Sequence, residues 1–457
     1  MQSKLLLATT LGAALAPLAS ADNVVGLYVF HRHGDRTAKA WQPVSLTPLG
    51  ADEVLSSGDF FRKRYVASDA GDLRISQLSS DRAVLSQLAV TAPVDNVLHN
   101  SAVVFLQGLG PLGGYQYIPV NAVVDAASSG NSEGSSWLQG GSGCSQAIVS
   151  SNNYLQSPDY AKTYADSKDF YQGLLPVING TYNATQATFK NGYSIFDLIN
   201  VAEIHNSSIS SKDILTKPTL ARLYDLASTH EWNLAFNASD PVRAISGSVL
   251  AGQILDSLQD VANGKASAPR FNIQFGAYGT FMSFFGLAQL PAASNDFYGI
   301  CDYASSMVFE LVAPTATGYK ADDLSVRFYF SNGTAGEDGL KQFPLFGQDK
   351  TTLSWNDFKT SMNKFAIADT KHWCQVCGNT DGACASSTPS SGGSASTKSS
   401  SSRNSVTKPV AGVIGALVTL VVVLGIQAAV LLLGGLRLVK KSTLAGGTNT
   451  GAAGVKA

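Results

Sequence analysis

The sequence is short of charged residues. Only 14% of its 457 residues are charged, and the formal net charge is −1, whereas soluble globular domains carry about 25% charged residues. A near-neutral chain gives no support for nucleic-acid binding or for a broad anion-steering surface. No internal repeat is visible, and the length suffices for one large domain or two modest ones. Ser, Thr, Gly and Asn take the place of the missing charged residues, as a glycosylated exterior allows.

Cysteine is also scarce, and the five present do not form a good metal site. Three of them stand in "WCQVCGNTDGAC" with only His372 nearby as a fourth ligand, which favours a local disulfide over zinc. In an oxidising compartment most of the five should pair, leaving one thiol over or pairing it between chains. We therefore predict no metal and no cofactor. The disulfide candidates are Cys144, Cys301, Cys374, Cys377 and Cys384.

The first 21 residues are typical of a secretory signal peptide. Lys4 precedes a short apolar run that ends in Ala19-Ser20-Ala21, a small-residue cleavage site. An N-terminal membrane anchor is the alternative, but the apolar run is too short to span a bilayer comfortably. We expect cleavage after Ala21.

Residues 409–436 contain no charge and exceed the ~20 residues that a spanning helix needs. Arg437, Lys440 and Lys441 follow at once, as at a cytoplasmic flank. A GPI signal or a buried core helix fits less well, because a polar tail follows and the run is long and uncharged. The sequence thus predicts a single-pass membrane protein with a cytoplasmic tail at 437–457, placed at the cell surface or in a vacuolar membrane.

The segment before this span is Ser/Thr-rich. Residues 385–408 have almost nothing to bury and predict an O-glycosylated stalk. The remaining residues, 22–384, are expected to form one lumenal or extracellular domain. This domain contains five Asn-x-Ser/Thr acceptors for N-glycans: Asn179, Asn183, Asn206, Asn237 and Asn332.

Hydrophobic patterning within the domain predicts an α/β fold. Strands are expected at 23–30, 270–275, 307–313 and 326–333. A helix is expected from Thr47, with Pro48 at its first position, and another over 240–261 with ordinary core spacing. The region 157–231 favours helices and predicts a mostly helical insertion, so we expect a sheet domain with a helical cap at about 150–240.

The stretch "VFHRHGDRTAKAW" follows the first apolar strand. Arginine forks match phosphate oxygens, and a neutral histidine held at one ring nitrogen can attack phosphorus with the other. Ligands bind at the carboxyl ends of strands in α/β sheets, where this stretch stands. A packed histidine beside a surface ion-pair cluster is the structural alternative.

Residues Arg32-His33-Gly34-Asp35-Arg36 resemble the Arg-His-Gly-x-Arg signature of the histidine acid phosphatases, the branch that includes phytases. Segments 46–65, 101–111 and 275–291 are similar to further family segments, in the family's order, and the resemblance covers about 23–367. It implies a phosphoglycerate-mutase-like sheet domain flanked by helices, with a helical cap. It also implies phosphomonoester hydrolysis through a phosphohistidine at His33, with Arg32 and Arg36 binding the phosphate.

The chain departs from the family pattern at three places. The family's third phosphate-binding arginine aligns with Val97, and a proline of the extended motif aligns with Ala38. The family's His-Asp pair, which binds phosphate and protonates the leaving oxygen, falls on Tyr278 and Gly279. The Tyr278 hydroxyl retains the capacity to hydrogen-bond a phosphate oxygen, whereas Gly279 has no proton to donate.

A substitute acid is therefore needed for fast hydrolysis of alkyl esters, since general acid catalysis contributes about 10²–10⁴-fold. Candidate donors are Asp35, Glu231 and Asp240, and His230 is interpreted as an ordinary helix histidine. Two hypotheses remain: an acid-phosphatase-like hydrolase with an altered donor site, or a catalytically impaired phosphate-binding or structural membrane glycoprotein that keeps the fold.

Overall fold

The computed structural model describes residues 22–110, 116–123, 143–205, 211, 213–380 and 384. The chain divides into two units, Met1–Pro389 and Ser390–Ala457, and every described residue belongs to the first. The predicted signal peptide, stalk, membrane span and tail, together with Asn206, lie outside the described residues. Among the helices that the structure describes, none has the length and apolar character needed to cross a membrane.

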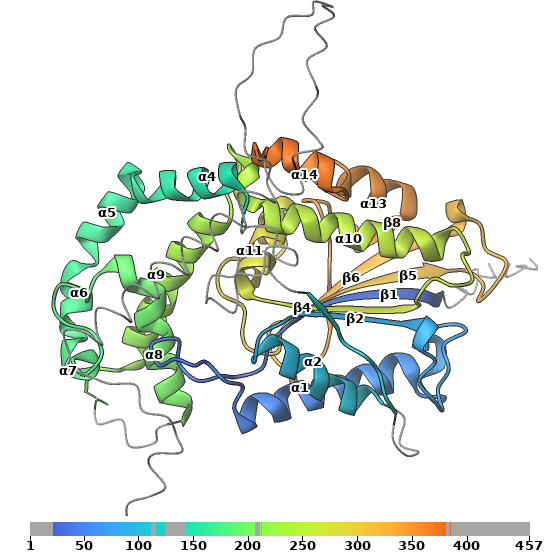
Figure 1. Cartoon of the computed structure of the whole chain (residues 1–457), viewed down its shortest axis with the longest axis horizontal. Coiled ribbons are helices and arrows are strands. Elements are labelled where there is room, and N and C mark those ends of the chain that lie inside the picture. Colours follow the sequence, from blue (N-terminus) through green and yellow to red (C-terminus); the bar gives the residue numbers. More distant parts are fainter. Residues whose placement is uncertain are drawn as a thin grey trace, which may run out of the picture. The chain divides into compact units, whose positions relative to one another are not determined.

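A mixed sheet forms the centre of the described unit (Figure 1). Its strands run in the order β3-β2-β4-β1-β5-β6-β7, with β8 also paired to β6. The pairs β1/β4, β2/β4 and β2/β3 are parallel, and the remaining pairs are antiparallel. The strands are β1 (Asn23–Arg32), β2 (Leu88–Pro93), β3 (Asn121–Val123), β4 (Phe271–Gly276), β5 (Ser306–Ala313), β6 (Ser325–Ser331), β7 (Lys341–Phe343) and β8 (Thr352–Ser354).

Strand β1 is buried on both faces because each face packs against helices. Its side chains therefore belong alternately to two hydrophobic cores. One core includes Val25, Tyr28 and Phe30, and the other includes Val24, Leu27 and Val29. The first core is completed by α10 (Ile245–Ala262), α11 (Tyr278–Leu287) and α13 (Trp355–Met362); the second by α1 (Pro48–Phe61) and α2 (Leu98–Leu109).

The predicted cap region is helical in its described part. It contains α4 (Ser145–Leu155), α5 (Pro158–Asp166), α6 (Lys168–Gly173), α7 (Leu175–Ile178), α8 (Gly192–His205) and α9 (Lys217–Ala235). These helices gather on one side of the sheet domain (Figure 1), and their apolar faces enclose a separate core that includes Tyr171, Phe189 and Leu198. The stretch 157–178 forms three short helices. Ser167 stands between the first and the second, and Leu174 stands between the second and the third.

The predicted disulfide framework is present. Cys144 pairs with Cys377 across 233 residues, which joins the start of α4 to α14 (Thr370–Cys377). Cys374 pairs with Cys384, a local bridge within "WCQVCGNTDGAC". Cys301 is the remaining thiol and is buried.

The four described glycosylation acceptors differ in accessibility. Asn179 and Asn183 are exposed, whereas Asn237 and Asn332 are partly buried. The Asn332 side-chain oxygen accepts a hydrogen bond from the Asp302 backbone at 2.9 Å. N-glycosylation stays a prediction, and Asn179 and Asn183 are the best-presented acceptors.

Candidate active site

The two segments predicted to form the site lie side by side. Strands β1 and β4 are parallel neighbours, and their register pairs Arg32 with Gly276, so both strands end at the same edge of the sheet. The motif loop follows β1 directly, and α11 begins at Tyr278, two residues after β4 ends. The site therefore stands at the carboxyl edge of the parallel strands, where α/β sheets bind ligands.

The motif loop is pressed against the first turn of α1. A Cβ atom added at Gly34 would lie 2.1 Å from the Gly50 carbonyl oxygen, so no other residue fits there. The Gly34 backbone N–H donates to Ser101 Oγ at 3.3 Å, and Ser101 belongs to one of the segments that resemble the family. These contacts fix the backbone on which His33 stands.

His33 is completely buried, and its ring orientation is defined. Its Nδ1 lies 2.8 Å from the Gly34 carbonyl oxygen, which can only accept a hydrogen bond. Nδ1 therefore carries the proton, and in the neutral ring Nε2 keeps the lone pair. The Tyr303 ring lies 5.6 Å from the His33 ring, centroid to centroid, and closes one side. This is the tautomer that a nucleophilic histidine needs.

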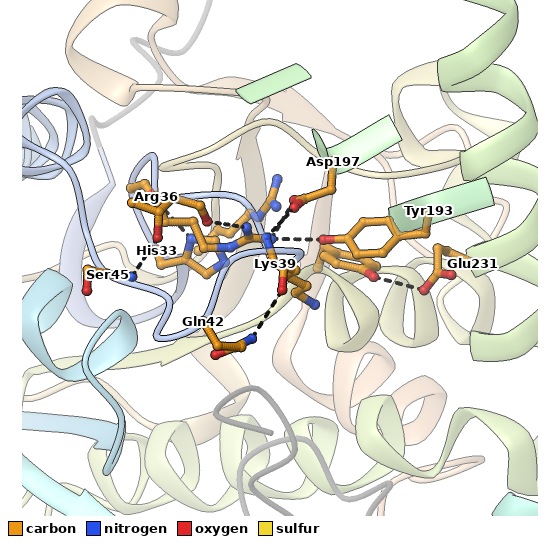
Figure 2. A network of polar contacts seen from close by, with 12 residues as sticks. His33, Arg36, Lys39, Gln42, Ser45, Tyr193, Asp197 and Glu231 are labelled. Carbon is orange, nitrogen blue, oxygen red and sulfur yellow. Dashed lines mark hydrogen bonds and ion pairs between the residues drawn. The ribbon is translucent and has the colours of Figure 1, made fainter. Parts of the chain in front are cut away.

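Arg36 is held by the cap helix α8. Its Nη2 donates to Asp197 Oδ1 at 2.8 Å and to the Tyr193 hydroxyl at 3.0 Å, and both partners lie on α8. Figure 2 shows Asp197 and Tyr193 directed at Arg36. The side chains of Arg36 and Asp197 are 0% and 4% exposed, so this is a buried ion pair that joins the cap to the motif loop.

Arg32 is held by the segment before β5 rather than by the cap. Its Nη1 donates to the Cys301 carbonyl oxygen. The guanidinium stands 4.6 Å from the Tyr303 ring centroid and 5.4 Å from that of Tyr278, within cation–π range. Its Nε is buried and has no hydrogen-bond partner among the described residues. Each of the two predicted arginines is thus already positioned by protein groups.

Tyr278 is placed at the site and linked to an acid. Its hydroxyl donates to Glu231 Oε2 at 2.8 Å, and Glu231 Oε1 lies 2.8 Å from His230 Nδ1. Both partners come from α9, so the cap completes this part of the site. At Gly279, an added Cβ would meet nothing within 4 Å. The position of the family's acid is therefore open space beside the Tyr278–Glu231 pair.

The other two donor candidates are engaged elsewhere. Asp35 is buried and accepts from Thr47 Oγ1 at 2.5 Å, with His205 Nε2 also at 2.5 Å from the same oxygen. Asp240 accepts from Ser150 Oγ at 2.5 Å, at the junction of α4 with the turn before α10. Of the three carboxylates, Glu231 alone has a hydrogen bond to Tyr278 among the described contacts.

Val97 offers no charge at the place of the third arginine, since it is an apolar residue, 2% exposed, that precedes α2. Another cation is present that the sequence analysis did not single out. Lys39 Nζ lies 4.8 Å from the Tyr193 ring centroid and 5.7 Å from that of Tyr278. Its backbone N–H donates to Asp197 Oδ2 at 2.7 Å. Its only sequence signal is its place three residues after Arg36.

Burial sets the charge state of several neighbouring groups. Burial lowers the pKa of His31, on β1, to about 4, so this histidine is neutral and packs against Phe105 and Phe275. Burial also raises the pKa of Tyr303, which keeps its phenol protonated beside the arginines. In the described part of the chain, no group of His, Cys, Asp and Glu is arranged to hold a metal ion.

Comparisons with known proteins bear on the fold and on the family. A family model described as histidine phosphatase superfamily (branch 2) matches residues 39–331, more than half of the chain. Comparison with curated protein sequences gives no significant match.

Among solved structures, the fold is similar to those of three phytases. The Hafnia alvei phytase in complex with myo-inositol hexakis sulphate has a TM-score of 0.55 at 13% identity, covering 79% of this chain and 99% of that one. The D. castellii phytase has a TM-score of 0.54 at 14% identity, covering 80% and 84%. The Citrobacter braakii phytase has 0.53 at 13%, covering 78% and 99%. The fold and the extent of the family match together show that the chain belongs to branch 2 of the histidine phosphatase superfamily.

Proposed function

We propose that the protein hydrolyses phosphomonoesters through a phosphohistidine at His33. One observation carries the proposal: His33 is buried in the motif loop that follows β1, which also carries the buried Arg32 and Arg36, and its Nδ1 lies 2.8 Å from a carbonyl oxygen. His33 Nε2 forms a bond to phosphorus while the bond from phosphorus to the ester oxygen breaks. Water then attacks phosphorus, the bond to nitrogen breaks, and inorganic phosphate and free His33 are released.

In this proposal the positive groups hold the phosphoryl oxygens. Arg32 and Arg36 neutralise the charge that spreads over these oxygens in the transition state. Lys39 stands over the rings of Tyr193 and Tyr278 and takes the place of the cation that Val97 does not provide. Tyr278 contributes a hydroxyl group to the set of groups around the phosphoryl oxygens. No acid stands at Gly279, so the leaving oxygen receives its proton slowly, and phenol esters react faster than alkyl esters.

A second function is favoured by the arginine contacts. Arg36 is already neutralised by Asp197, and Arg32 already donates to the Cys301 carbonyl. A site whose cations have internal partners suits a phosphate-binding or structural protein that has lost turnover. The retained tautomer of His33 favours the hydrolase.

A steady-state assay separates the two functions. The purified protein is assayed on p-nitrophenyl phosphate and on an alkyl phosphate from pH 3 to 8, beside His33→Ala and the matched control His372→Ala, an exposed histidine on α14. The hydrolase predicts activity on the aryl ester that disappears only in His33→Ala. Equal background in all three proteins supports the non-catalytic function.

We also propose that the domain is displayed outside the cytoplasm by the span at 409–436. Two disulfides support an oxidising compartment. The proposal predicts that the protein fractionates with membranes and resists extraction by alkaline carbonate. It also predicts that deglycosylation increases its gel mobility. Recovery in the soluble fraction would contradict the membrane span. An unchanged gel mobility would contradict glycosylation of the domain.

A further inference from the structure

A cavity of about 200 Å³ opens beside Arg32. Helices α8 and α9 form its cap side, and residues 300–303, just before β5, form its sheet side. Arg32 is 4% exposed and contributes to the wall, and within the described part of the chain its Nε–H has no partner, as expected of a group that binds an anion. Arg32 thus belongs both to the cavity wall and to the proposed phosphate site, and the cavity offers the adjoining space for the rest of a substrate.

The cavity wall is largely apolar and aromatic. Aliphatic side chains from both helices contribute, together with the rings of Phe196, Tyr224 and Tyr303. Apolar and aromatic walls favour a compact apolar group, and aromatic faces attract cations. The Tyr224 hydroxyl donates to the Ile300 carbonyl at 2.8 Å, which fixes that ring in the wall.

The charges around the cavity are unequal. Arg32 is the only cationic side chain in its described lining, whereas Asp197, Glu203 and Asp302 are carboxylates. Asp197 is committed to Arg36, but Glu203 and Asp302 have no ion-pair partner among the described residues. A second phosphate on the substrate would thus meet carboxylates and no cation of the described lining besides Arg32, and would lose hydration without compensation. An amino group would meet both carboxylates and the aromatic rings.

We infer that the cavity selects monophosphate esters of compact phenols or alcohols that carry an amino group, and rejects polyphosphorylated substrates. The inference rests on the proposed function, since it assigns the cavity to the leaving group of that reaction. It distinguishes this chain from the Hafnia alvei phytase of similar fold, which was solved with myo-inositol hexakis sulphate, a polyanion.

The test is a series of three aryl phosphates of one shape and different charge. All three carry the same phosphate, and the substituent opposite it on the ring is an ammonium group in O-phosphotyramine (the cationic ester), a propyl group in 4-propylphenyl phosphate (the neutral ester) and a carboxylate in O-phospho-3-(4-hydroxyphenyl)propionate (the anionic ester). Phenol leaving groups react without the missing acid, and the charged group lies two carbons from the ring, where its effect on leaving-group acidity is small. We expect kcat/KM to fall in that order, by about tenfold from the cation to the anion. Inositol hexakisphosphate should be hydrolysed more slowly than all three.

Charge-removing variants test the assignment to Glu203 and Asp302. The double variant Glu203→Gln, Asp302→Asn should bring the three esters within about twofold of one another. Asp349→Asn, an exposed carboxylate outside the cavity, should keep the wild-type order. The inference is overturned if the anionic ester or inositol hexakisphosphate is the best substrate, or if the double variant keeps the wild-type order.

A binding measurement distinguishes failure of this inference from failure of the proposed function. The affinities of the three esters for His33→Ala are measured by calorimetry, which needs no turnover. If the wild-type protein hydrolyses none of them but His33→Ala binds the cation most tightly, the proposed function fails and the charge preference stands. If the wild-type protein hydrolyses all three equally and His33→Ala binds them equally, the function stands and the inference fails.

Discussion

Gly279 is the position predicted for the family's acid, and it has room for a side chain. A Cβ there meets nothing within 4 Å, and its backbone is not in the left-handed region. Gly279→Asp should therefore fold normally and place an acid beside Tyr278. We expect kcat/KM on an alkyl phosphate to rise by about 10²-fold, with a much smaller change on p-nitrophenyl phosphate, because only the poor leaving group needs the proton.

The matched control is Gly279→Asn, which has the same shape but no acidic proton. It should leave the ratio of alkyl to aryl activity at the wild-type value. An unchanged ratio in Gly279→Asp would mean that another acid, with Glu231 the first candidate, already protonates the leaving oxygen.

Residues of the motif were predictable from sequence, but their partners were not. His33, Arg32 and Arg36 are local in sequence and follow an apolar strand, so residue type and position were enough. The Asp197 carboxylate that joins Arg36 and Lys39 lies 158 residues after Lys39. Such a contact depends on how the cap packs against the motif loop, and no local sequence pattern predicts it. Glu231 was one of three candidate acids until its hydrogen bond to Tyr278 singled it out.

Strand β1 carries a pH-sensitive residue, His31. Burial lowers the pKa of His31 from 6.5 to about 4. Between pH 6.5 and pH 4, His31 therefore binds a proton in the unfolded chain but not in the folded chain. The stability contributed by neutral His31 is therefore present above pH 6.5 and is lost as the pH falls toward 4. Compared with His31→Gln, the wild-type free energy of unfolding should fall by about 3 kcal/mol more over this window.

Denaturant unfolding of both proteins at several pH values measures this difference. Parallel curves for the wild type and His31→Gln between pH 6.5 and 4 would show that His31 does not resist protonation in the folded state.

Helix α8 connects the cap to the motif through the buried pair Arg36–Asp197. Asp197→Asn should lower the free energy of unfolding by about 3 kcal/mol, because it removes the carboxylate of a buried ion pair. Inorganic phosphate should then raise the melting temperature of Asp197→Asn more than that of the wild type, since it replaces the lost counter-charge. Thermal unfolding with and without phosphate tests both statements, and equal phosphate shifts would argue against phosphate binding at Arg36.

Among the secondary-structure elements, the long apolar strands could be predicted from the sequence. Strands β1, β4, β5 and β6 matched their predicted ranges closely, because buried central strands are rich in β-branched and aromatic residues. Strands β3, β7 and β8 have three residues each and no clear alternation, so they went unpredicted. The helix predicted from 240 begins at Ile245, after a short 3₁₀ turn at Pro241–Ala244.

For the whole molecule, the two disulfides should contribute unequally to stability. Cys144–Cys377 spans 233 residues and Cys374–Cys384 spans 10. Loop-closure entropy predicts losses of about 5 and about 3 kcal/mol when each pair is replaced by serine. Unfolding of the two double variants measures the difference. A larger loss from the short bridge would show that chain entropy does not determine their order.

The overall architecture was also accessible from sequence in part. Strand, turn and helix at 23–66 predicted the α/β class, and the helix-rich stretch after 150 predicted the cap. The mixed strand order was not accessible, since pairing β1 with both β4 and β5 depends on contacts more than 230 residues apart. The cavity beside Arg32 is likewise a product of docking, because its two sides come from α8–α9 and from 300–303.

The most direct test of the account is to trap the phosphoenzyme. The protein is mixed rapidly with an aryl phosphate labelled at phosphorus, quenched in alkali, which preserves phosphohistidine, and digested for mass spectrometry. The account predicts one phosphorylated peptide, modified at His33, that appears within the first turnover and is absent from His33→Ala. Release of product with no phosphate on His33, or labelling that persists in His33→Ala, would contradict it.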